Sequence, residues 1–385
     1  MDVQLPRRVL VISATMGEGH NAAAEALSVI MEDRWGCRVE RLDTMELRGE
    51  RFARAARWAY AFQLSVLPWS YAIFYKWLSR SDLFANFMKR VIGPFFGRRL
   101  SRVIDSAKPD LLISTYPFGS AALDWLRSNG AVRMPTVTYI PAFHVHPLWV
   151  YPSIDMHFVI YDSAAAHARL PGFERSMRMG APPVRDGFGQ FDRGEVREAL
   201  QLPAGEFIVL VTGGAWGLGD MSKGVEALLK LEPFVHVIAV CGKNASLENE
   251  LGRLTPAFLG RLSVYGYVST MPQLMAAANV VVTNGAGVTV LEALRSARPV
   301  IAFAPLAGHG TASTAEMVRR NLALEARDVP KLVDQVRRLR TSSGLAQSME
   351  QAAEEWVAGR SLGRSVAEIE EMYLERAGAV GRVPG

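Results

Sequence analysis

The stretch RVLVISATMGEGHNAAAEALSVIM, residues 8–31, decides the fold of the first part of the chain. Residues 8–13 form an apolar run that is typical of a parallel strand buried on both faces. Gly17 and Gly19 then interrupt the pattern, and residues 21–31 are rich in Ala and Leu, which favours a helix. A strand, a glycine turn and a helix in this order begin an α/β domain.

Similar apolar runs recur along the chain, each followed by enough residues for the crossover helix that parallel strands require. They lie at residues 111–114, 136–140, 156–160, 207–212, 235–241, 262–265, 280–283 and 300–304. The pattern predicts two Rossmann-like, doubly wound domains that face each other across a ligand cleft and are joined near residues 182–195. We assign residues 1–185 to an N-terminal domain, 195–359 to a C-terminal domain, and 360–385 to a terminal helix and tail.

The composition is that of an ordinary globular protein, with 385 residues of which 49% are hydrophobic and 21% charged. This length accommodates two hydrophobic cores. Cys37 and Cys241 lie far apart in apolar surroundings, which favours reduced, buried thiols over a disulfide scaffold. The apolar run after Arg8 is too short for a signal sequence, so a cytosolic setting is expected.

Basic and aromatic side chains are concentrated in residues 51–102. This segment holds ten Lys or Arg residues and a single acid, Asp82, so its net charge is +9, and it also holds thirteen aromatic residues. Cations beside exposed aromatic rings attract anionic head groups and insert apolar surface. We therefore expect a helical, membrane-associating insertion that binds peripherally to the cytoplasmic face of an anionic membrane.

Other interpretations of this segment stay open at the level of the sequence. The aromatic rings could fill the core of a helical subdomain whose cations face solvent. Residues 58–75 form an uncharged run that approaches the length of a transmembrane helix, although Pro68 interrupts it. A basic patch could also bind nucleic acid, but no recognised nucleic-acid motif accompanies it, so no nucleic-acid partner is expected.

The first glycine turn carries a candidate catalytic residue. Gly17 and Gly19 let the backbone pass close to a ligand, and His20 follows them at the start of the helix. A histidine at the carboxyl end of a strand faces the expected cleft and could accept a proton from an acceptor hydroxyl. The alternative is a histidine that only caps or packs the helix.

The second half carries a similar junction, Asn284-Gly-Ala-Gly-Val-Thr289, between the strand at 280–283 and a helix. Its small residues let the helix N-terminus approach a diphosphate, to which Thr289 could donate a hydrogen bond. Glu292 lies one helical turn further and could bind the hydroxyl groups of a ribose, or could instead be a capping-box glutamate. The loop at 213–217, which includes Gly214, lies on the same edge, and neither loop has a Walker lysine.

The order of these motifs resembles the family of monogalactosyldiacylglycerol synthases and processive diacylglycerol glucosyltransferases, and more distantly the bacterial glycosyltransferase MurG. The resemblance covers nearly the whole chain. It is carried by VLVISATMGEGHNAAAEAL from Val9, HPLWVYPSIDMHFV from His146, VCGKNASLENEL from Val240, VYGYVSTMPQLMAAANVVVTNGAGVTVLEAL from Val264 and PLAGH from Pro305.

The resemblance implies a GT-B fold and assigns roles to residues of this chain. It implies that His20 is catalytic and that Gly17, Gly19, His146 and Trp149 lie on the side of the lipid acceptor. For the nucleotide sugar it implies that Tyr267 and Val268 lie near uracil and Glu292 binds ribose. It further implies that Gly285, Gly287, Val288 and Thr289 hold the diphosphate, with Gly214 on the same edge, and that Gly308 and His309 lie near the sugar.

The implied reaction is an inverting transfer of glucose or galactose from UDP-glucose or UDP-galactose to diacylglycerol or a related glycolipid. The helix N-terminus stabilises the leaving diphosphate in this scheme, so neither a metal ion nor a cofactor is expected. The chain departs from the family's usual residues at Pro141, at Gly310 and at Asn284, where the family often has an acid, a glutamate and a lysine. The alternatives are transfer to a polyprenyl or natural-product acceptor and a membrane-bound nucleotide-sugar-binding protein without turnover. A UDP-sugar epimerase of similar architecture is disfavoured, because such an enzyme has no need of a basic aromatic membrane segment.

Overall fold

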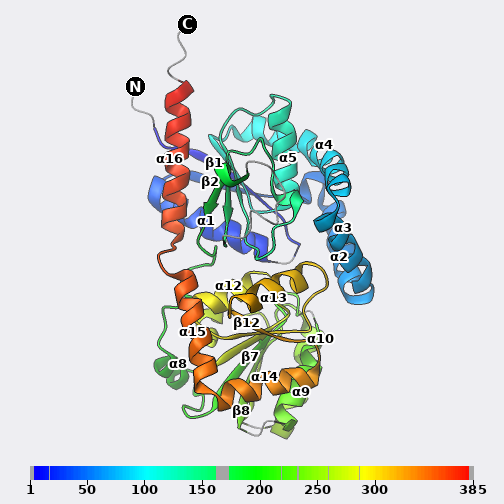
Figure 1. Ribbon diagram of the computed structural model, residues 1–385, viewed down its shortest axis with the longest axis vertical. Coiled ribbons are helices and arrows are strands. Elements are labelled where there is room, and N and C mark those ends of the chain that lie inside the picture. The colour runs from blue at the N-terminus through cyan, green and yellow to red at the C-terminus, as the bar shows by residue number, and fades with distance from the viewer. Residues whose placement is uncertain are drawn as a thin grey trace. The chain divides into compact units, whose positions relative to one another are not determined.

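The computed structural model describes residues 4–16, 18–161, 173–217, 219–231, 234–258, 260–285 and 287–380. Its contacts divide the chain into two compact units. Unit 1 comprises Met1–Gln63, Trp69–Pro183 and Gly359–Gly385, and unit 2 comprises Leu64–Pro68 and Val184–Ala358. Each unit contains one six-stranded parallel sheet with helices packed against it (Figure 1), so the predicted α/β class is confirmed.

The sheet of unit 1 has the strand order β2-β1-β3-β4-β5-β6. Its strands are β1 (Arg8–Ser13), β2 (Arg38–Asp43), β3 (Leu111–Ser114), β4 (Thr136–Tyr139), β5 (Met156–Val159) and β6 (Met177–Met179). Its helices are α1 (Gly19–Trp35), η1 (Glu46–Arg48), α2 (Glu50–Val66), α3 (Pro68–Arg80), α4 (Asp82–Ala107), α5 (Pro117–Ser128), η2 (Pro147–Trp149), α7 (Phe173–Ser176) and α16 (Leu362–Val380). The chain order reverses between β1 and β3, which pair directly with each other.

Two apolar cores cover the two faces of this sheet. On one face, α4 and α5 pack together and bury side chains such as Phe96 and Leu100. On the other face, α1 and the C-terminal helix α16 lie side by side (Figure 1), and Val366 and Ile369 of α16 are fully buried in that core. The last helix of the chain therefore completes the first unit.

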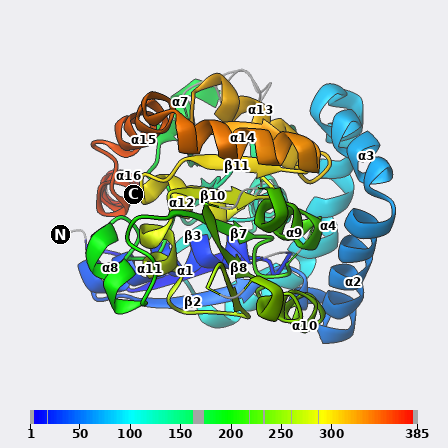
Figure 2. The same ribbon diagram turned by 90° about the horizontal axis from the view of Figure 1, so that it is seen from below.

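Helices α2 and α3 extend the crossover between β2 and β3 and lie farther from the sheet than α4 (Figure 2). The aromatic side chains of residues 51–102 differ in burial, and four of them, Tyr60, Tyr71, Phe74 and Phe84, are half-buried. Tyr75 and Phe96 are buried, in keeping with the helical-subdomain interpretation, whereas seven other rings are exposed. Those seven belong to Phe52, Trp58, Phe62, Trp69, Trp77, Phe87 and Phe95.

The exposed apolar side chains follow a regular spacing on these helices. On α3 they are Trp69, Ile73 and Trp77, and on α4 they are Leu83, Phe87, Val91 and Phe95. Residues four positions apart share one face of a helix, so each helix has an exposed apolar stripe. Within the described part of the chain, no helix is long and apolar enough to span a bilayer, and the uncharged run breaks between α2 and α3.

The sheet of unit 2 has the strand order β12-β11-β10-β7-β8-β9. Its strands are β7 (Phe207–Thr212), β8 (Val235–Val240), β9 (Leu262–Tyr265), β10 (Val280–Thr283), β11 (Val300–Phe303) and β12 (Ala323–Ala326). Its helices are α8 (Arg193–Ala199), α9 (Met221–Leu231), α10 (Ala245–Gly252), η3 (Thr255–Phe258), α11 (Met271–Ala277), α12 (Val288–Arg295), α13 (His309–Arg319), α14 (Val329–Thr341) and α15 (Ser343–Val357). The chain order reverses between β7 and β10.

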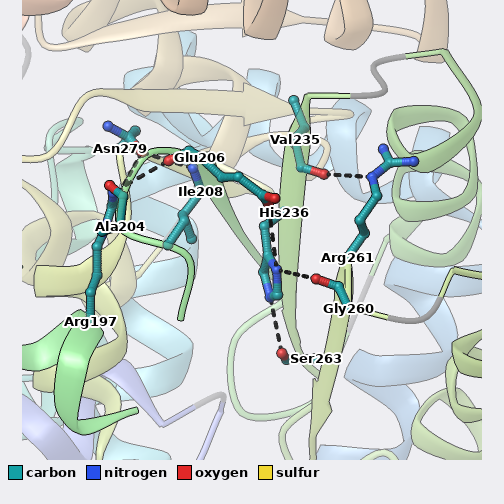
Figure 3. A network of polar contacts seen from close by, with 10 residues as sticks. All are labelled: Arg197, Ala204, Glu206, Ile208, Val235, His236, Gly260, Arg261, Ser263 and Asn279. Carbon is teal, nitrogen blue, oxygen red and sulfur yellow. Dashed lines mark hydrogen bonds and ion pairs between the residues drawn. The ribbon is translucent and has the colours of Figure 1, made fainter. Parts of the chain in front are cut away.

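A network of buried polar groups holds the amino-terminal edge of this sheet (Figure 3). The guanidinium group of Arg197, which is 6% exposed, donates to the carbonyl oxygens of Ala277, Ala204 and Glu206 and to Oδ1 of Asn279. Oδ1 of Asn279 also accepts the backbone N–H of Ile208 at 2.7 Å. One cation thus joins α8 to the beginnings of β7 and β10, and each of its three nitrogen atoms donates at least one hydrogen bond, as expected of a buried guanidinium.

His236 at the start of β8 belongs to the same edge. Its Nδ1 lies 3.0 Å from the carbonyl oxygen of Gly260, and its Nε2 lies 3.0 Å from Oγ of Ser263. Because a carbonyl oxygen can only accept, Nδ1 carries the proton and Nε2 accepts from the serine hydroxyl. Burial lowers the pKa of His236, so the ring is a neutral structural link between β8 and β9.

Candidate functional site

In each unit, the loops at the point where the strand order reverses carry several of the candidate site residues. In a doubly wound sheet the loops after the two strands at the reversal diverge, and ligands bind between them. In unit 1 these are the loops after β1 and β3, and in unit 2 they are the loops after β7 and β10.

His20 occupies the second position of α1, directly beyond β1. Its Nδ1 lies 2.8 Å from the carbonyl oxygen of Thr115, the residue that follows β3, and the hydroxyl of Thr115 donates to the carbonyl oxygen of His20 at 3.0 Å. The two loops at the strand reversal are therefore tied together. The ring also contacts Tyr116 edge to face at 5.0 Å between centroids and Trp149 at 5.8 Å.

These contacts determine the protonation of His20. Although the ring keeps some exposure, desolvation by its neighbours lowers its pKa from 6.5 to about 4. The imidazole is therefore neutral at physiological pH, and its single proton lies on Nδ1 because that atom faces a carbonyl oxygen. Nε2 keeps its lone pair, and this is the form that a general base needs.

A cluster of histidine and aromatic side chains extends this site. His146 is the N-cap of η2, and its ring lies 6.1 Å from that of Trp149, which is 3% exposed. Tyr75 of α3 lies between two histidines, because its hydroxyl is 2.8 Å from Nδ1 of His144 and its ring is 5.7 Å from that of His146. The helical insertion thus contributes a side chain to this histidine cluster.

In unit 2 the loops after β7 and β10 are also linked. The side-chain amide of Asn284 lies 3.5 Å from the carbonyl oxygen of Gly213. Gly285 has a φ of +72°, and a Cβ there would collide with Oγ1 of Thr314 and the side chain of Ala302. Only glycine satisfies both the conformation and the space. Gly214, in the loop after β7, also has a positive φ.

The loop after β10 leads into the N-terminus of α12. Gly287 is the N-cap, with a φ of +76°, and no side chain accepts a hydrogen bond at this helix start. Val288 and Thr289 supply the first backbone N–H groups, which point out of the helix and carry partial positive charge. This end of α12 can therefore bind an anion through backbone groups.

Glu292 lies one turn further along α12 and is 7% exposed. Burial raises the pKa of its carboxyl group from 4.5 to about 7, while the charge of Arg185 opposes this rise. The capping-box interpretation of Glu292 does not hold, because Thr289 lies inside the helix and Gly287 is the N-cap. A buried carboxylate without a capping role favours the alternative, hydrogen bonding to a ligand.

Two further loops reach the same edge of the sheet in unit 2. Gly308 and His309 begin α13 after β11, and Gly308 has a φ of +75°. Tyr267 and Val268 follow β9, and the ring of Tyr267 is 62% exposed. The ammonium group of Lys243 lies 5.4 Å from the centre of that ring. An exposed aromatic ring of this kind can stack on a planar base.

The structure brings the predicted residues together in two groups, one in each unit. Gly19, His20, His146 and Trp149 form the group in unit 1; Gly17 lies outside the described residues. Gly214, Tyr267, Val268, Gly285, Gly287, Val288, Thr289, Glu292, Gly308 and His309 form the group in unit 2. Among the described residues, no cluster of three or more His, Cys, Asp or Glu side chains could hold a metal ion.

Several residues of these groups escape prediction from the sequence. Tyr75, Tyr116 and His144 lie beside the predicted histidines, and Thr314 lies beneath Gly285. Tyr116 could have been found, because it follows the apolar run at 111–114 by two residues. Tyr75 and Thr314 belong to other helices, and only the tertiary structure brings them to the site.

Family models match both halves of the chain. Residues 20–178 match the model described as monogalactosyldiacylglycerol (MGDG) synthase, and residues 209–342 match that of glycosyl transferases group 1. The chain is a glycosyltransferase. The glycosyltransferase is 26% identical over 308 residues to the processive diacylglycerol beta-glucosyltransferase of Bacillus licheniformis, with 78% of each protein covered. The predicted resemblance is confirmed.

Solved structures with the same fold cover nearly the whole glycosyltransferase. MurG of Acinetobacter baumannii has a TM-score of 0.60 at 14% identity, over 95% of this chain and 99% of MurG. HepE of Anabaena, solved with UDP and glucose, has a TM-score of 0.55 at 14% identity, over 94% and 98% of the two chains. These likenesses establish the fold as GT-B.

Proposed function

We propose that this glycosyltransferase transfers a hexose, glucose or galactose, from a UDP-sugar to diacylglycerol or a related glycolipid at a membrane surface, with inversion at the anomeric carbon. The observation that carries the proposal is the order of the loops along one edge of the sheet in unit 2.

The loops of unit 2 follow the order of the parts of a nucleotide sugar. Gly308 and His309 lie after β11, the uncapped start of α12 and the Gly214 loop lie after β10 and β7, and Tyr267 lies after β9. With neighbouring strands about 4.8 Å apart, β11 and β9 are separated by roughly 19 Å. We assign the sugar to the first loop, the diphosphate to the two central loops and the base to Tyr267, with the ribose on Glu292. HepE, which shares the fold, was solved with UDP and glucose.

His20 is the general base in this proposal. Its Nε2 accepts the proton of the acceptor hydroxyl while the oxygen attacks the anomeric carbon and the bond to the diphosphate breaks. The N–H groups at the start of α12 stabilise the charge that develops on the diphosphate, so the reaction as proposed uses no metal ion. A single displacement of this kind inverts the anomeric configuration, which agrees with the beta-glucosyl name of the relative, since UDP-hexoses are α-linked.

The lipid acceptor is proposed from the relatives and from the insertion. The relatives at 24–26% identity carry the name processive diacylglycerol beta-glucosyltransferase. The exposed stripes on α3 and α4 place Trp69, Trp77 and Phe87 where they can enter the interface of a bilayer, and nearby cations such as Arg90 attract anionic lipids. We infer that the protein binds peripherally to the cytoplasmic leaflet.

The reaction is tested by measuring UDP release from UDP-glucose and from UDP-galactose, each with diacylglycerol in vesicles containing phosphatidylglycerol. We expect release that depends on both diacylglycerol and one donor, and a β-linked product by proton NMR of its anomeric signal. An α-linked product would refute inversion. Absence of release with either donor, from protein that binds the vesicles and UDP, would refute the proposed acceptor.

The membrane surface is tested separately by vesicle sedimentation. Replacing Trp69, Trp77 and Phe87 with alanine should weaken binding at every salt concentration, because apolar insertion is not screened. Replacing Arg90 with glutamine should weaken binding mainly at low salt, because charge attraction is screened. A replacement of the exposed Phe234 of unit 2 by alanine is the matched control and should change nothing. Unchanged binding of the triple variant would refute the proposed surface.

A further inference from the structure

A cavity of about 320 Å³ lies in unit 2 at the end of α12 that is remote from the proposed diphosphate loop. Ser296, Arg295 and Arg298 line it from the turn after α12, and Glu354 lines it from α15. Gly189 and Phe191 close it from the segment that precedes α8. This cavity belongs neither to the donor loops nor to the histidine cluster of unit 1.

Two residues that line this cavity each have a buried polar atom with no hydrogen-bond partner among the residues that the structure describes. One is the hydroxyl of Ser296, a residue that is only 4% exposed. The other is Nε of Arg298. Leaving such groups unpaired costs free energy, so most buried polar groups in proteins have partners. Both atoms can donate, and the guanidinium can only donate. The missing partner is therefore an acceptor.

The charges favour an anionic acceptor. Two basic residues, Arg295 and Arg298, and one acidic residue, Glu354, line the cavity, so positive charge is in excess there. Glu350 does not saturate Arg298, because it lies 3.8 Å from Nη1 of Arg298 and bonds more closely, at 3.0 Å, to Arg193. Arginine binds oxyanions through several planar donors at once. Phe191 and Val357 form an apolar wall, which could contact a small organic group attached to the anion.

The geometry points to a binding site for a small oxyanionic ligand, such as a phosphate monoester, held by Arg298, Arg295 and the hydroxyl of Ser296. This site is separate from the donor site. Helix α12 has eight residues, and at 1.5 Å per residue its two ends lie about 12 Å apart. One phosphate cannot contact both ends. A ligand in the cavity nevertheless contacts the turn that ends α12, the helix on which Thr289 and Glu292 lie.

The test is a titration with inorganic phosphate, followed by isothermal calorimetry at constant ionic strength and with saturating UDP present. UDP occupies the proposed diphosphate loop, so phosphate binding that persists must lie elsewhere. We expect Arg298→Gln to weaken phosphate binding tenfold or more, and Ser296→Ala to weaken it about threefold, from the usual worth of charged and neutral hydrogen bonds. Arg253→Gln, which removes an exposed cation from α10's end, is the matched control and should leave phosphate binding unchanged.

The outcomes separate this inference from the proposed function. If Arg298→Gln and Ser296→Ala both bind phosphate as the wild type does, or if UDP abolishes phosphate binding, the cavity is not the site. Ser296→Ala is the safer variant for folding, because it removes a buried hydroxyl that has no partner among the described residues. If UDP itself fails to bind while phosphate binding still depends on Arg298, the donor assignment fails and the cavity stands.

Discussion

The acid limb of the activity profile tests the environment of His20. The pKa of this residue is lowered from 6.5 to about 4 because burial beside Tyr116 and Trp149 desolvates the ring, and the hydrogen bond to the carbonyl oxygen of Thr115 offsets only part of this shift. At pH 5.5 roughly 97% of the imidazole is neutral with a pKa of about 4, but only roughly 9% would be neutral with a pKa of 6.5. Since only the neutral ring acts as a base, turnover should change little between pH 7.5 and pH 5.5.

The assay is UDP release at saturating donor over pH 4.5 to 8.5, because a saturating donor removes the contribution of Glu292 to donor binding. His20→Ala should lower turnover at least a hundredfold and abolish the remaining acid limb, while UDP affinity stays close to the wild-type value. A roughly tenfold loss of activity between pH 7.5 and pH 5.5 would show that the working ring is solvated. Wild-type turnover in His20→Ala would remove the residue from catalysis.

Four further predictions concern unit 2. Burial raises the pKa of Glu292 to about 7, and the ribose is proposed to bind the ionised carboxylate. UDP should therefore bind roughly tenfold more tightly at pH 8 than at pH 6. Calorimetry should show this pH dependence in the wild type and not in Glu292→Gln. The same raised pKa means that the folded state keeps a proton that the unfolded chain has lost, so this group's contribution to stability increases as the pH falls from about 7 to 4.5. Gly285→Ala should lower the free energy of unfolding by about 2 kcal/mol or more, because the positive φ strains an alanine backbone and the new Cβ collides with Thr314. Gly287 has a similar φ but no neighbour within 4 Å of an added Cβ, so Gly287→Ala should lower the free energy of unfolding less in the same urea titration. Arg197→Gln should cost about 3 kcal/mol in urea unfolding and leave the turnover of the folded fraction unchanged, because the network lies at the edge opposite the site; equal stability would refute its role.

The sequence predicts the inner strands well and the edge strands poorly. The predicted strand at 8–13, for example, coincides with β1, because strands buried on both faces are continuous apolar runs. The missed strands β2, β6 and β12 all lie at sheet edges. Edge strands contact fewer neighbours and tolerate charged residues, so β2 reads Arg-Val-Glu-Arg-Leu-Asp and carries no apolar run.

The candidate site could be predicted only where it lies on one loop. Gly285, Thr289 and Glu292 share a single loop and helix, so their spacing in the sequence carries the information. The protonation of His20 depends on Thr115, which lies 95 residues away and meets it only because β1 and β3 pair. Long-range contacts of this kind leave no local signal in the chain.

The packing of α16 has a consequence for how the chain is made. Ser365 accepts the backbone N–H of Ala181 and contacts the hydroxyl of Tyr139, and Glu370 binds both Arg34 and Trp35. These contacts join the last helix to elements that leave the ribosome long before it does. Unit 2 has its whole sequence by residue 358, whereas the core formed by α1 stays open until α16 emerges. During synthesis unit 1, which contains the first strand of the chain, is therefore completed only after unit 2 has emerged, and a chain that stops before residue 362 would leave the core around α1 open.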